Sequence, residues 1–250
     1  MRFVLFVMNK VDNKQRTRSE SKWAKYQILK SLPDLIPYLP ATQRFTRRNL
    51  WQFIAKYGTV MLKPTLGHSG YGIIQVSRLE KYRYALQKED RKIILDGKQA
   101  VYEQIDKMIL DQSYLVQQRI PLAQIEKRPF DIRVVVSRAN KDTARKIKGM
   151  FAKVAEEGYV ITNVASQVIP VKQAIESSNL KPDSIQKLIR KIELVCLVAA
   201  RYLCSFYPSQ NMIGLDIGLD RDAQVWIIEA NFKPSMKPFL LLKRRSEPQK

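Results

Sequence analysis

The sequence is short of the residues on which much enzyme chemistry depends. Its 250 residues include two cysteines, one histidine and nine glycines. A single histidine gives no credible Ser-His-Asp or Cys-His arrangement for nucleophilic catalysis. No apolar run approaches the roughly 18 residues that a transmembrane helix requires, so no membrane span is expected.

The two cysteines, Cys196 and Cys204, lie eight residues apart in an apolar helical stretch. This separation is too large for a bridge within one helix, so both are expected to pack as small hydrophobic side chains. The apolar residues 1–8 lack a following small-residue cleavage site and do not form a secretory signal. The expected location is therefore the reducing cytoplasm.

Acidic residues are half as numerous as basic ones, 23 against 44, and the formal net charge is +21. Residues 1–62 contain twelve Lys or Arg and three Asp or Glu, and residues 243–245 read Lys-Arg-Arg. Such asymmetry indicates an anionic partner, such as an acidic polymer, nucleic acid or the anionic surface of an assembly. The alternative is a basic surface that only keeps the protein soluble. Nucleic acid is disfavoured, because no helix-turn-helix, zinc-finger or RNP pattern accompanies the charge.

Residues 214–231 predict a β-hairpin that can hold a divalent metal. If its turn is centred just after Asp222, Asp216 and Glu229 face each other across the two strands. Asn231 projects from the same face as Glu229. Two opposed carboxylates repel unless a cation lies between them, and this oxygen-rich set suits Mg²⁺ that carries phosphates. The alternative is a surface hairpin with a solvated acidic pair, which the apolar residues around it oppose.

A short apolar strand over residues 59–63 ends in Lys63 and is followed by a loop that contains Gly67, Gly70 and Gly72. Glycines at this density let backbone N–H groups approach a phosphate closely. A second strand follows the loop, which argues against a P-loop or a Rossmann turn, where a helix follows. A lysine that closes a buried strand usually has an anionic partner. The alternative for Lys63 is a lysine that reaches solvent from the strand end.

The order of these motifs resembles that of the ATP-grasp superfamily. Its YheC/YheD group, known as endospore coat-associated proteins, is the most similar. The similar motifs are Ser21–Trp23, Tyr38–Thr42, Tyr114–Ile120, Arg128–Arg133 and Trp226–Ser235, and the similarity runs from about Ser21 to Pro238. The resemblance implies an α+β chain with the ATP-grasp fold, in which two α+β lobes enclose the nucleotide. It also implies that the full N-terminal α/β domain usual in such ligases is missing.

The resemblance implies a role for each matching residue, with ATP and Mg²⁺ as cofactors. Lys63 matches a catalytic lysine that contacts the nucleotide phosphates, and Arg133 matches an arginine near the transferred phosphate. The remaining matches are Lys22, Gly67, Ser69, Gly70, Gly72 and Asn163 for the nucleotide, Gln117, Gln118, Arg119 and Ile120 for the adenine hinge, and Asp216, Glu229 and Asn231 for the metal. The sequence departs from its relatives near Lys153, where an arginine is usual, and after Asn163, where a Gly-Gly pair is usual.

Residues Asp131 and Arg133 lie two apart on a predicted strand over residues 130–138, so both point to one face. We expect the Asp131 carboxylate to hold the Arg133 guanidinium by a charge-assisted hydrogen bond. The remaining N–H donors of Arg133 would then bind phosphate oxygens. Further predictions are a strand at residues 147–155 and helices near residues 19–32, 46–58, 101–110 and 184–205.

Four segments are expected along the chain. These are a basic N-terminal segment with helices at 1–58, a small ATP-grasp lobe with the glycine loop and hinge at 59–120, a large lobe with the metal hairpin at 121–238, and a basic tail at 239–250.

The function that the resemblance implies is Mg-ATP-dependent ligation of a carboxylate to an amine or thiol through an acylphosphate. The substrates are unknown; a peptide or an acidic polymer is among the candidates. The alternative is a nucleotide-binding component of the spore coat, or of another assembly, without ligase turnover. Under either hypothesis the cytoplasm is the default location, and association with the spore coat is a further expectation.

Overall fold

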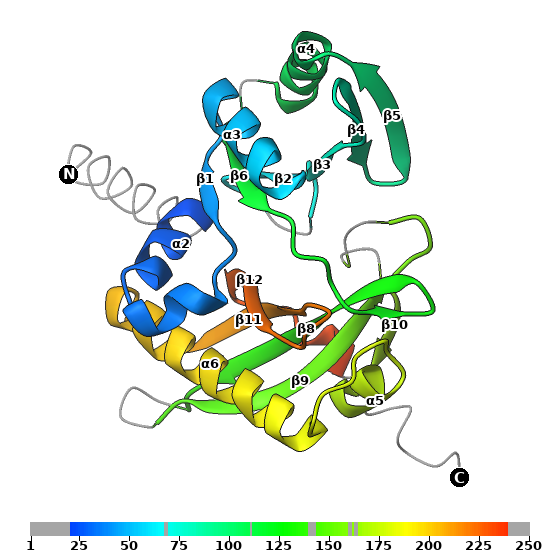
Figure 1. The fold of residues 1–250 in the computed structure, drawn as a ribbon. Coiled ribbons are helices and arrows are strands. Elements are labelled where there is room, and N and C mark those ends of the chain that lie inside the picture. Colours follow the sequence, from blue (N-terminus) through cyan, green and yellow to red (C-terminus); the bar gives the residue numbers. More distant parts are fainter. Residues whose placement is uncertain are drawn as a thin grey trace, which may run out of the picture.

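Short stretches rich in Val, Ile and Leu form two antiparallel sheets in a computed structural model of the chain. The structure describes residues 21–67, 70–110, 112–139, 144–159, 162 and 165–239. One sheet has the strand order β1-β6-β2-β3-β4-β5 and the other β10-β9-β8-β11-β12, with β7 paired to β8. Figure 1 shows the first sheet and its helices above the second. We call these parts the small lobe and the large lobe.

The small lobe has two helices, α3 and α4, on one face of its sheet. Helix α3 begins after Thr46, whose hydroxyl accepts a hydrogen bond from the Asn49 amide (3.1 Å), and it ends at Gly58, which has φ of 72°. Such caps satisfy backbone groups that the helix itself leaves unpaired. Apolar residues of both helices and of the sheet share one buried core. The elements are β1 Thr42–Arg44, α3 Arg47–Tyr57, β2 Thr59–Pro64, β3 Ile74–Arg78, β4 Arg83–Lys88, β5 Arg91–Asp96, α4 Lys98–Ile109 and β6 Tyr114–Gln118.

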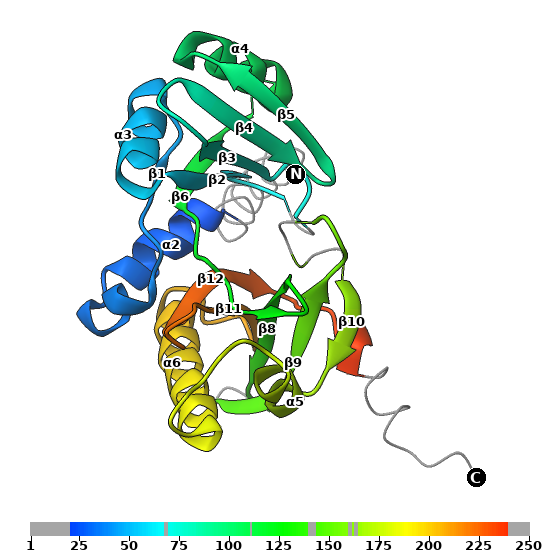
Figure 2. The ribbon, with the colours of Figure 1, turned by 45° about the vertical axis from the view of Figure 1, so that its right-hand side comes forward.

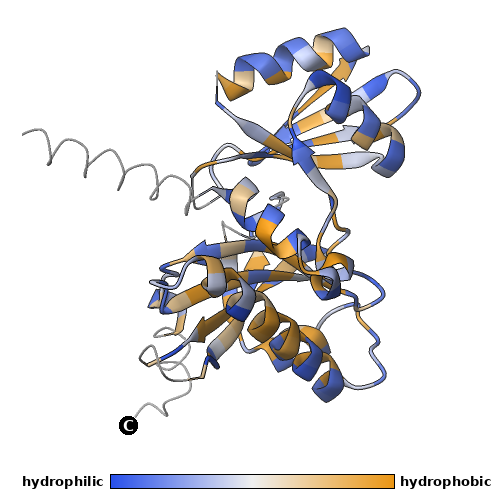
Figure 3. Ribbon diagram, turned by 90° about the vertical axis from the view of Figure 1, so that its left-hand side faces the viewer, coloured by the Kyte–Doolittle hydropathy of each residue, from blue (hydrophilic) through white to orange (hydrophobic). Residues whose placement is uncertain are grey.

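The large lobe has the long helix α6 along the outer face of its sheet. Side chains of α6, among them Ile192, Cys196 and Ala199, pack against the strands in a second buried core. Figure 3 shows this helix and the strands beside it as the most apolar part of the chain. The elements are β7 Gln124–Ile125, β8 Arg128–Ser137, β9 Lys146–Ala155, β10 Ala165–Ile169, α5 Val171–Glu176, α6 Ile185–Phe206, β11 Met212–Leu219 and β12 Val225–Phe232.

The chain before residue 58 contributes to both lobes. Strand β1 pairs with β6 at the edge of the small-lobe sheet. Helix α2, Lys22–Lys30, packs against α6 and β12 of the large lobe, and a short 3-10 helix, Pro33–Tyr38, follows it. The Ser31 and Tyr202 hydroxyls, 2.9 Å apart, also join this segment to α6. The four predicted segment boundaries stay predictions.

The predicted helices and long strands are confirmed within the described residues, with ends that differ by a few positions. Cys196 and Cys204 are buried free thiols, as expected, and burial raises the pKa of each. No helix of the described chain is both long enough and apolar enough to cross a membrane. Figure 2 shows the inner faces of the two sheets turned toward each other, and the region between them contains the candidate site.

Candidate functional site

A cleft of about 730 Å³, counted with the space open to solvent at its mouth, lies between the two sheets. Strand β2, the segment after β6, and the large-lobe strands β8, β11 and β12 contribute to it. Its apolar walls include Met61 from β2 and Ile228 from β12. The predicted site residues that line it are Lys63, Gln117, Gln118, Arg119, Ile120, Asp216 and Glu229. The fold therefore brings seven of the fifteen positions that the sequence singled out to one cleft.

The predicted hinge comprises the last two residues of β6 and the two that follow, and it is held to the rest of the small lobe. The Gln118 amide donates to the Ala41 carbonyl (2.8 Å), and its side-chain oxygen accepts from the Ala41 amide (3.3 Å). The buried Gln117 donates through Nε2 to the Thr42 hydroxyl (2.9 Å), which leaves its side-chain oxygen as an acceptor. Burial and the nearby Arg221 lower the pKa of Arg119.

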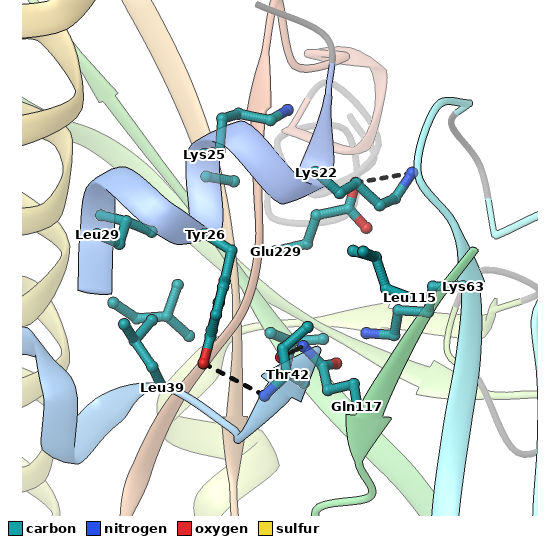
Figure 4. A pocket seen from close by; sticks show the side chains of 13 residues that line it. Lys22, Lys25, Tyr26, Leu29, Leu39, Thr42, Lys63, Leu115, Gln117 and Glu229 are labelled. Carbon is teal, nitrogen blue, oxygen red and sulfur yellow. Dashed lines mark hydrogen bonds and ion pairs between the residues drawn. The ribbon is translucent and has the colours of Figure 1, made fainter. Parts of the chain in front are cut away.

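The side chain of Lys63 is nearly enclosed, with 7% of its surface exposed. Within the described ranges, no hydrogen bond or ion pair to its Nζ is found. Burial lowers its pKa, and the fields of Glu229, Asp216 and Asp131 offset this effect only in part. Figure 4 shows the Lys63 ammonium pointing into the space between the lobes. A buried cation without a close anionic partner is costly, so this position favours an anion from outside the chain.

The hairpin of β11 and β12 carries the predicted metal residues on the face that lines the cleft. Asp216 pairs with Glu229, and Gly214 pairs with Asn231, which confirms the predicted cross-strand arrangement. The route to this register differs from the prediction, because Ile217 pairs with Ile227 and the ladder shifts by one residue at Ile228. This β-bulge lets Ile228 and Glu229 both line the cleft, although strict alternation would put them on opposite faces.

Asp216 is the centre of an ionic network on the large-lobe sheet. Arg133 donates through Nε and Nη2 to its two carboxylate oxygens, at 2.6 and 2.9 Å. Lys153 Nζ lies 3.4 Å from Asp216 Oδ1 and 3.1 Å from Asp131 Oδ1. The Asn231 amide nitrogen lies 3.3 Å from Asp216 Oδ2. Asp216 is thus shared by three donors.

One sequence prediction about this network is wrong. Asp131 and Arg133 do share a face of β8, but Asp131 does not hold the guanidinium. Strand register explains the difference: Arg133 lies opposite Asp216 on β11, and Asp131 lies opposite Lys153 on β9. Asp131 binds Lys153 and also accepts a short hydrogen bond from the Thr162 hydroxyl.

The network shifts the acidities of its members in opposite directions. Burial alone would raise the pKa of Asp216, but the charges of Lys153 and Arg133 and their hydrogen bonds lower it to about 2. Burial prevails at Asp131 and raises its pKa, although Lys153 attracts it. For Lys153, the attraction of Asp131 and Asp216 outweighs burial and raises the pKa. Asp216 is therefore the firmly ionised carboxylate of this pair.

The described part of the glycine loop has three glycines with positive φ, namely Gly67 (108°), Gly70 (69°) and Gly72 (76°). Gly72 is also needed for space, because a Cβ there would lie 2.8 Å from the Tyr114 hydroxyl. That hydroxyl donates to the Gly72 carbonyl (2.9 Å), which fastens the end of the loop to β6. The predicted residues Ser69 and Asn163 lie outside the described residues.

A second cavity of about 450 Å³, shown in Figure 4, lies behind the cleft against α2. The two cavities share Lys63, Gln117, Ile228 and Glu229. Lys22, at the start of α2, lies 3.7 Å from Glu229 Oε1 and donates to the Gly67 carbonyl at 2.5 Å. The predicted site residue Lys22 thus reaches both the glycine loop and β12.

Sequence reasoning missed Lys153 and Thr162 as members of the site. A signal for Lys153 was present, because a lysine between buried residues of a strand needs a partner. Pairing the two long strands antiparallel across the connection near residue 142 would have placed it opposite Asp131. Thr162 follows β9 in the connection to β10, and no pattern in the sequence indicates which residue it faces.

The described residues fit Mg²⁺ only in company with an anion. They contain no group of three or more Asp, Glu, His or Cys side chains able to hold a metal ion. Glu229, Asp216 and Asn231 supply oxygen ligands on one face, but the site has more cations than carboxylates. The cations are Lys22, Lys63, Arg133 and Lys153, and the carboxylates are Asp131, Asp216 and Glu229. A metal that arrives with phosphates suits this balance better than a bare ion.

Comparison with known proteins identifies relatives over most of the chain. A family model described as YheC/D like ATP-grasp matches residues 15–250. The chain is 24% identical over 225 residues to endospore coat-associated protein YheD of Bacillus subtilis (strain 168), and 24% identical over 227 residues to endospore coat-associated protein YheC of the same organism. Each match covers 88% of this chain, but 49% of YheD and 61% of YheC. The chain thus spans about half to three fifths of these relatives.

Solved structures confirm the fold prediction. D-alanyl-alanine synthetase A from Vibrio cholerae matches with a TM-score of 0.55 and 14% identity, over 92% of this chain and 60% of that chain. The N5-carboxyaminoimidazole synthase of Aspergillus clavatus, solved with ADP and 5-aminoimidazole ribonucleotide, matches with a TM-score of 0.51 and 10% identity, over 84% and 43%. The chain has the α+β ATP-grasp fold.

Proposed function

Because the chain belongs to the YheC/D like ATP-grasp family, we propose that it binds Mg-ATP between its lobes and uses it to activate a carboxylate. The activated carboxylate is then joined to an amine or a thiol.

The observation that carries the proposal is the buried ammonium of Lys63, for which the described part of the chain supplies no hydrogen bond or ion pair. An enclosed cation that faces a cleft is stabilised when an anion enters. A phosphate group is such an anion, and the neighbouring glycine loop offers backbone N–H groups to the same group. A triphosphate would also neutralise the excess positive charge to which Lys22, Arg133 and Lys153 contribute.

The hinge and the two apolar walls suit a purine base. Met61 and Ile228 come from opposite lobes and line the same cleft, so a flat base fits between them. The side-chain oxygen of Gln117 is an acceptor for the amino group of adenine. These features support a nucleotide with its base at the hinge and its phosphates at Lys63.

Asp216, Glu229 and Asn231 are the proposed Mg²⁺ ligands. The metal would neutralise charge that develops on the transferred phosphoryl group. Asp216 is suited to this role because its carboxylate stays ionised, but it must share its oxygens with Arg133. Glu229 must likewise be shared with Lys22.

In the proposed reaction, a carboxylate oxygen of the first substrate attacks the terminal phosphorus of ATP, and the bond to the bridging oxygen breaks to release ADP. The amine or thiol then attacks the acyl carbon, phosphate leaves and the nucleophile loses a proton. Neither step needs a protein nucleophile, which agrees with a chain that has one histidine. Arg133 is the proposed donor to the transferred phosphoryl group, because its planar fork matches phosphate geometry.

A second candidate function is a nucleotide-binding component of the spore coat that has no ligase turnover. The names of YheC and YheD, which describe them as endospore coat-associated proteins, favour this alternative. The sequence also lacks the Gly-Gly pair expected after Asn163, close to the acceptor. Association of this chain with a spore coat is part of this alternative.

Calorimetric titration of the full chain with Mg-ATP tests the nucleotide site. Substituting Lys63→Met removes the ammonium and keeps the length of the side chain, so affinity should fall by a factor of about 30 or more. Lys107→Met is the matched control, because Lys107 lies exposed on α4, away from the cleft. Equal affinity in Lys63→Met and in the wild type would overturn the nucleotide site.

Release of ADP in the presence of a panel of carboxylates and amines separates the two functions. Turnover that requires both a carboxylate and an amine or thiol supports the ligase. Tight ATP binding with no ADP release under any combination supports the coat component without turnover.

A further inference from the structure

Helix α2 brings one lysine against the start of the glycine loop. The backbone N–H of Lys22 donates to the Thr65 carbonyl (2.9 Å), and its Nζ donates to the Gly67 carbonyl (2.5 Å). Both acceptors lie just after the end of β2, and Gly67 is the first glycine of the loop. Two bonds from one residue therefore hold the segment 65–67, which we call the loop root.

Lys22 also contacts the large lobe. Helix α2 packs against α6 and β12, and Lys22 Nζ lies 3.7 Å from Glu229 Oε1 on β12. Figure 4 shows the Lys22 side chain extending from α2 past Glu229. The loop root belongs to the small lobe, so Lys22 joins it to the opposite side of the cleft.

The backbone at Gly67 needs such a contact to hold one orientation. Its φ of 108° is open to glycine and rarely to other residues. Apart from its chain neighbours, no atom of the described residues lies within 4 Å of a Cβ placed there, so packing against the described chain does not fix this residue. A hydrogen bond from a charged donor is about twice as strong as a neutral one, and here it fixes the direction of the Gly67 carbonyl.

We propose that Lys22 is a positioning residue that fixes the loop root to the start of α2 before any nucleotide arrives. Its ammonium acts through the Gly67 carbonyl, and Glu229 holds the ammonium in place. The resemblance implies a different role for this lysine, namely direct contact with nucleotide. The effect on ATP rests on the proposed function, whereas the effect on the loop root does not.

Hydrogen exchange of the full chain without nucleotide tests this role. Lys22→Met removes the ammonium but keeps the length of the side chain and the backbone bond to Thr65. Deuterium uptake by peptides over residues 64–74 should then become about tenfold faster or more, because a charged hydrogen bond that opposes opening is lost. Lys22→Arg keeps a charged donor and should restore most of the protection.

Two controls show whether the effect is local. Lys30→Met, at the exposed end of α2, should leave uptake over residues 64–74 as in the wild type. Peptides from α6 should exchange equally slowly in all variants. Unchanged uptake over residues 64–74 in Lys22→Met, or an equal rise in α6, would overturn the proposal.

Titration of the same variants with Mg-ATP distinguishes positioning from direct contact. If Lys22 acts by positioning, Lys22→Met should weaken ATP binding by about the same factor as it speeds exchange, because fewer molecules are ready to bind. Weaker binding with unchanged exchange indicates direct contact with nucleotide and sinks the positioning role. If the wild type binds no ATP, the proposed function fails, and the exchange result still decides the role of Lys22.

Discussion

The two sides of the cleft carry charge in different ways. On the large lobe, Asp216 and Asp131 neutralise Arg133 and Lys153 through contacts between neighbouring strands. On the small lobe, Lys63 is more fully buried than either of these cations but has no such contact within the described chain. The charges of the large-lobe network are therefore paired before a ligand binds, whereas the charge of Lys63 still lacks a partner among the described residues.

This difference separates charges that support the fold from a charge held ready for a ligand. A buried ion pair does little for stability while it is intact, but the loss of one partner leaves a costly unpaired charge. An unpaired buried cation instead lowers the free energy of unfolding of the ligand-free protein, and an anionic ligand that binds it can restore this free energy.

The largest effect on stability is expected for Asp216→Asn. Arg133 would lose both charge-assisted bonds and Lys153 would lose one of its two carboxylates. The free energy of unfolding should fall by about 3–5 kcal/mol, as measured by urea denaturation. Asp222→Asn, at the exposed hairpin turn, is the matched control and should change it by less than about 0.5 kcal/mol.

The dependence on pH identifies the cause of that loss. The pKa of Asp216 falls from an ordinary 3.8 to about 2 in the folded chain, so its stabilising effect is complete above pH 3.8. The effect disappears as the pH falls through about 2. The difference between the wild type and Asp216→Asn should shrink over this window, and a constant difference would contradict the ionic explanation.

Arg133→Lys is expected to have the next largest effect, and on turnover instead of stability. Lysine keeps a positive charge beside Asp216 but loses the planar fork. If the ligase proposal holds, ATP affinity should stay within a few-fold of the wild type, while the rate of ADP release should fall by about 10²–10³. A loss of affinity alone would assign Arg133 to nucleotide binding.

The smallest expected effect is a gain in stability for Lys63→Met in the absence of ATP. An apolar side chain of similar size should leave the free energy of unfolding unchanged or raise it by about 1 kcal/mol. The pKa of Lys63 lies below its ordinary 10.5, so the unfolded chain binds this proton more tightly. Wild-type stability should therefore recover as the pH rises toward 10.5, and the advantage of the variant should shrink.

Lys107→Met again serves as the control for this measurement, since its ammonium is exposed in both states. A fall in stability of several kcal/mol for Lys63→Met would show that the lysine has a structural partner, and the contrast between the lobes would fail.

The sequence predicted the elements better than the contacts between them. Periodic apolar residues and caps such as Thr46 and Gly58 act locally, so the helices and long strands followed from short segments. The partner of Arg133 did not follow, because it depends on the register between β8 and β11, which are far apart in the chain. Spacing along one strand shows which residues share a face and not which strand lies beside it.

The predicted pairing of Asp216 with Glu229 is confirmed, but the ladder between this pair and the turn differs from the prediction. The prediction used an unbroken ladder with its turn centred just after Asp222. In the structure the ladder near the turn is displaced by one residue, and the bulge at Ile228 displaces it back. Alternation of apolar and polar residues could not have revealed the bulge, because both Ile228 and Glu229 face the cleft.

Comparison of this hairpin among relatives therefore needs care at a single position. If a related chain lacks the residue that matches Ile228, the bulge disappears, but its glutamate still lies opposite the aspartate and keeps the same face. An alignment that closes such a gap would still print the Asp and Glu in matching columns. A chain that is one residue shorter there can thus keep the pair of carboxylates, but it loses the apolar side chain that Ile228 adds to the cleft wall.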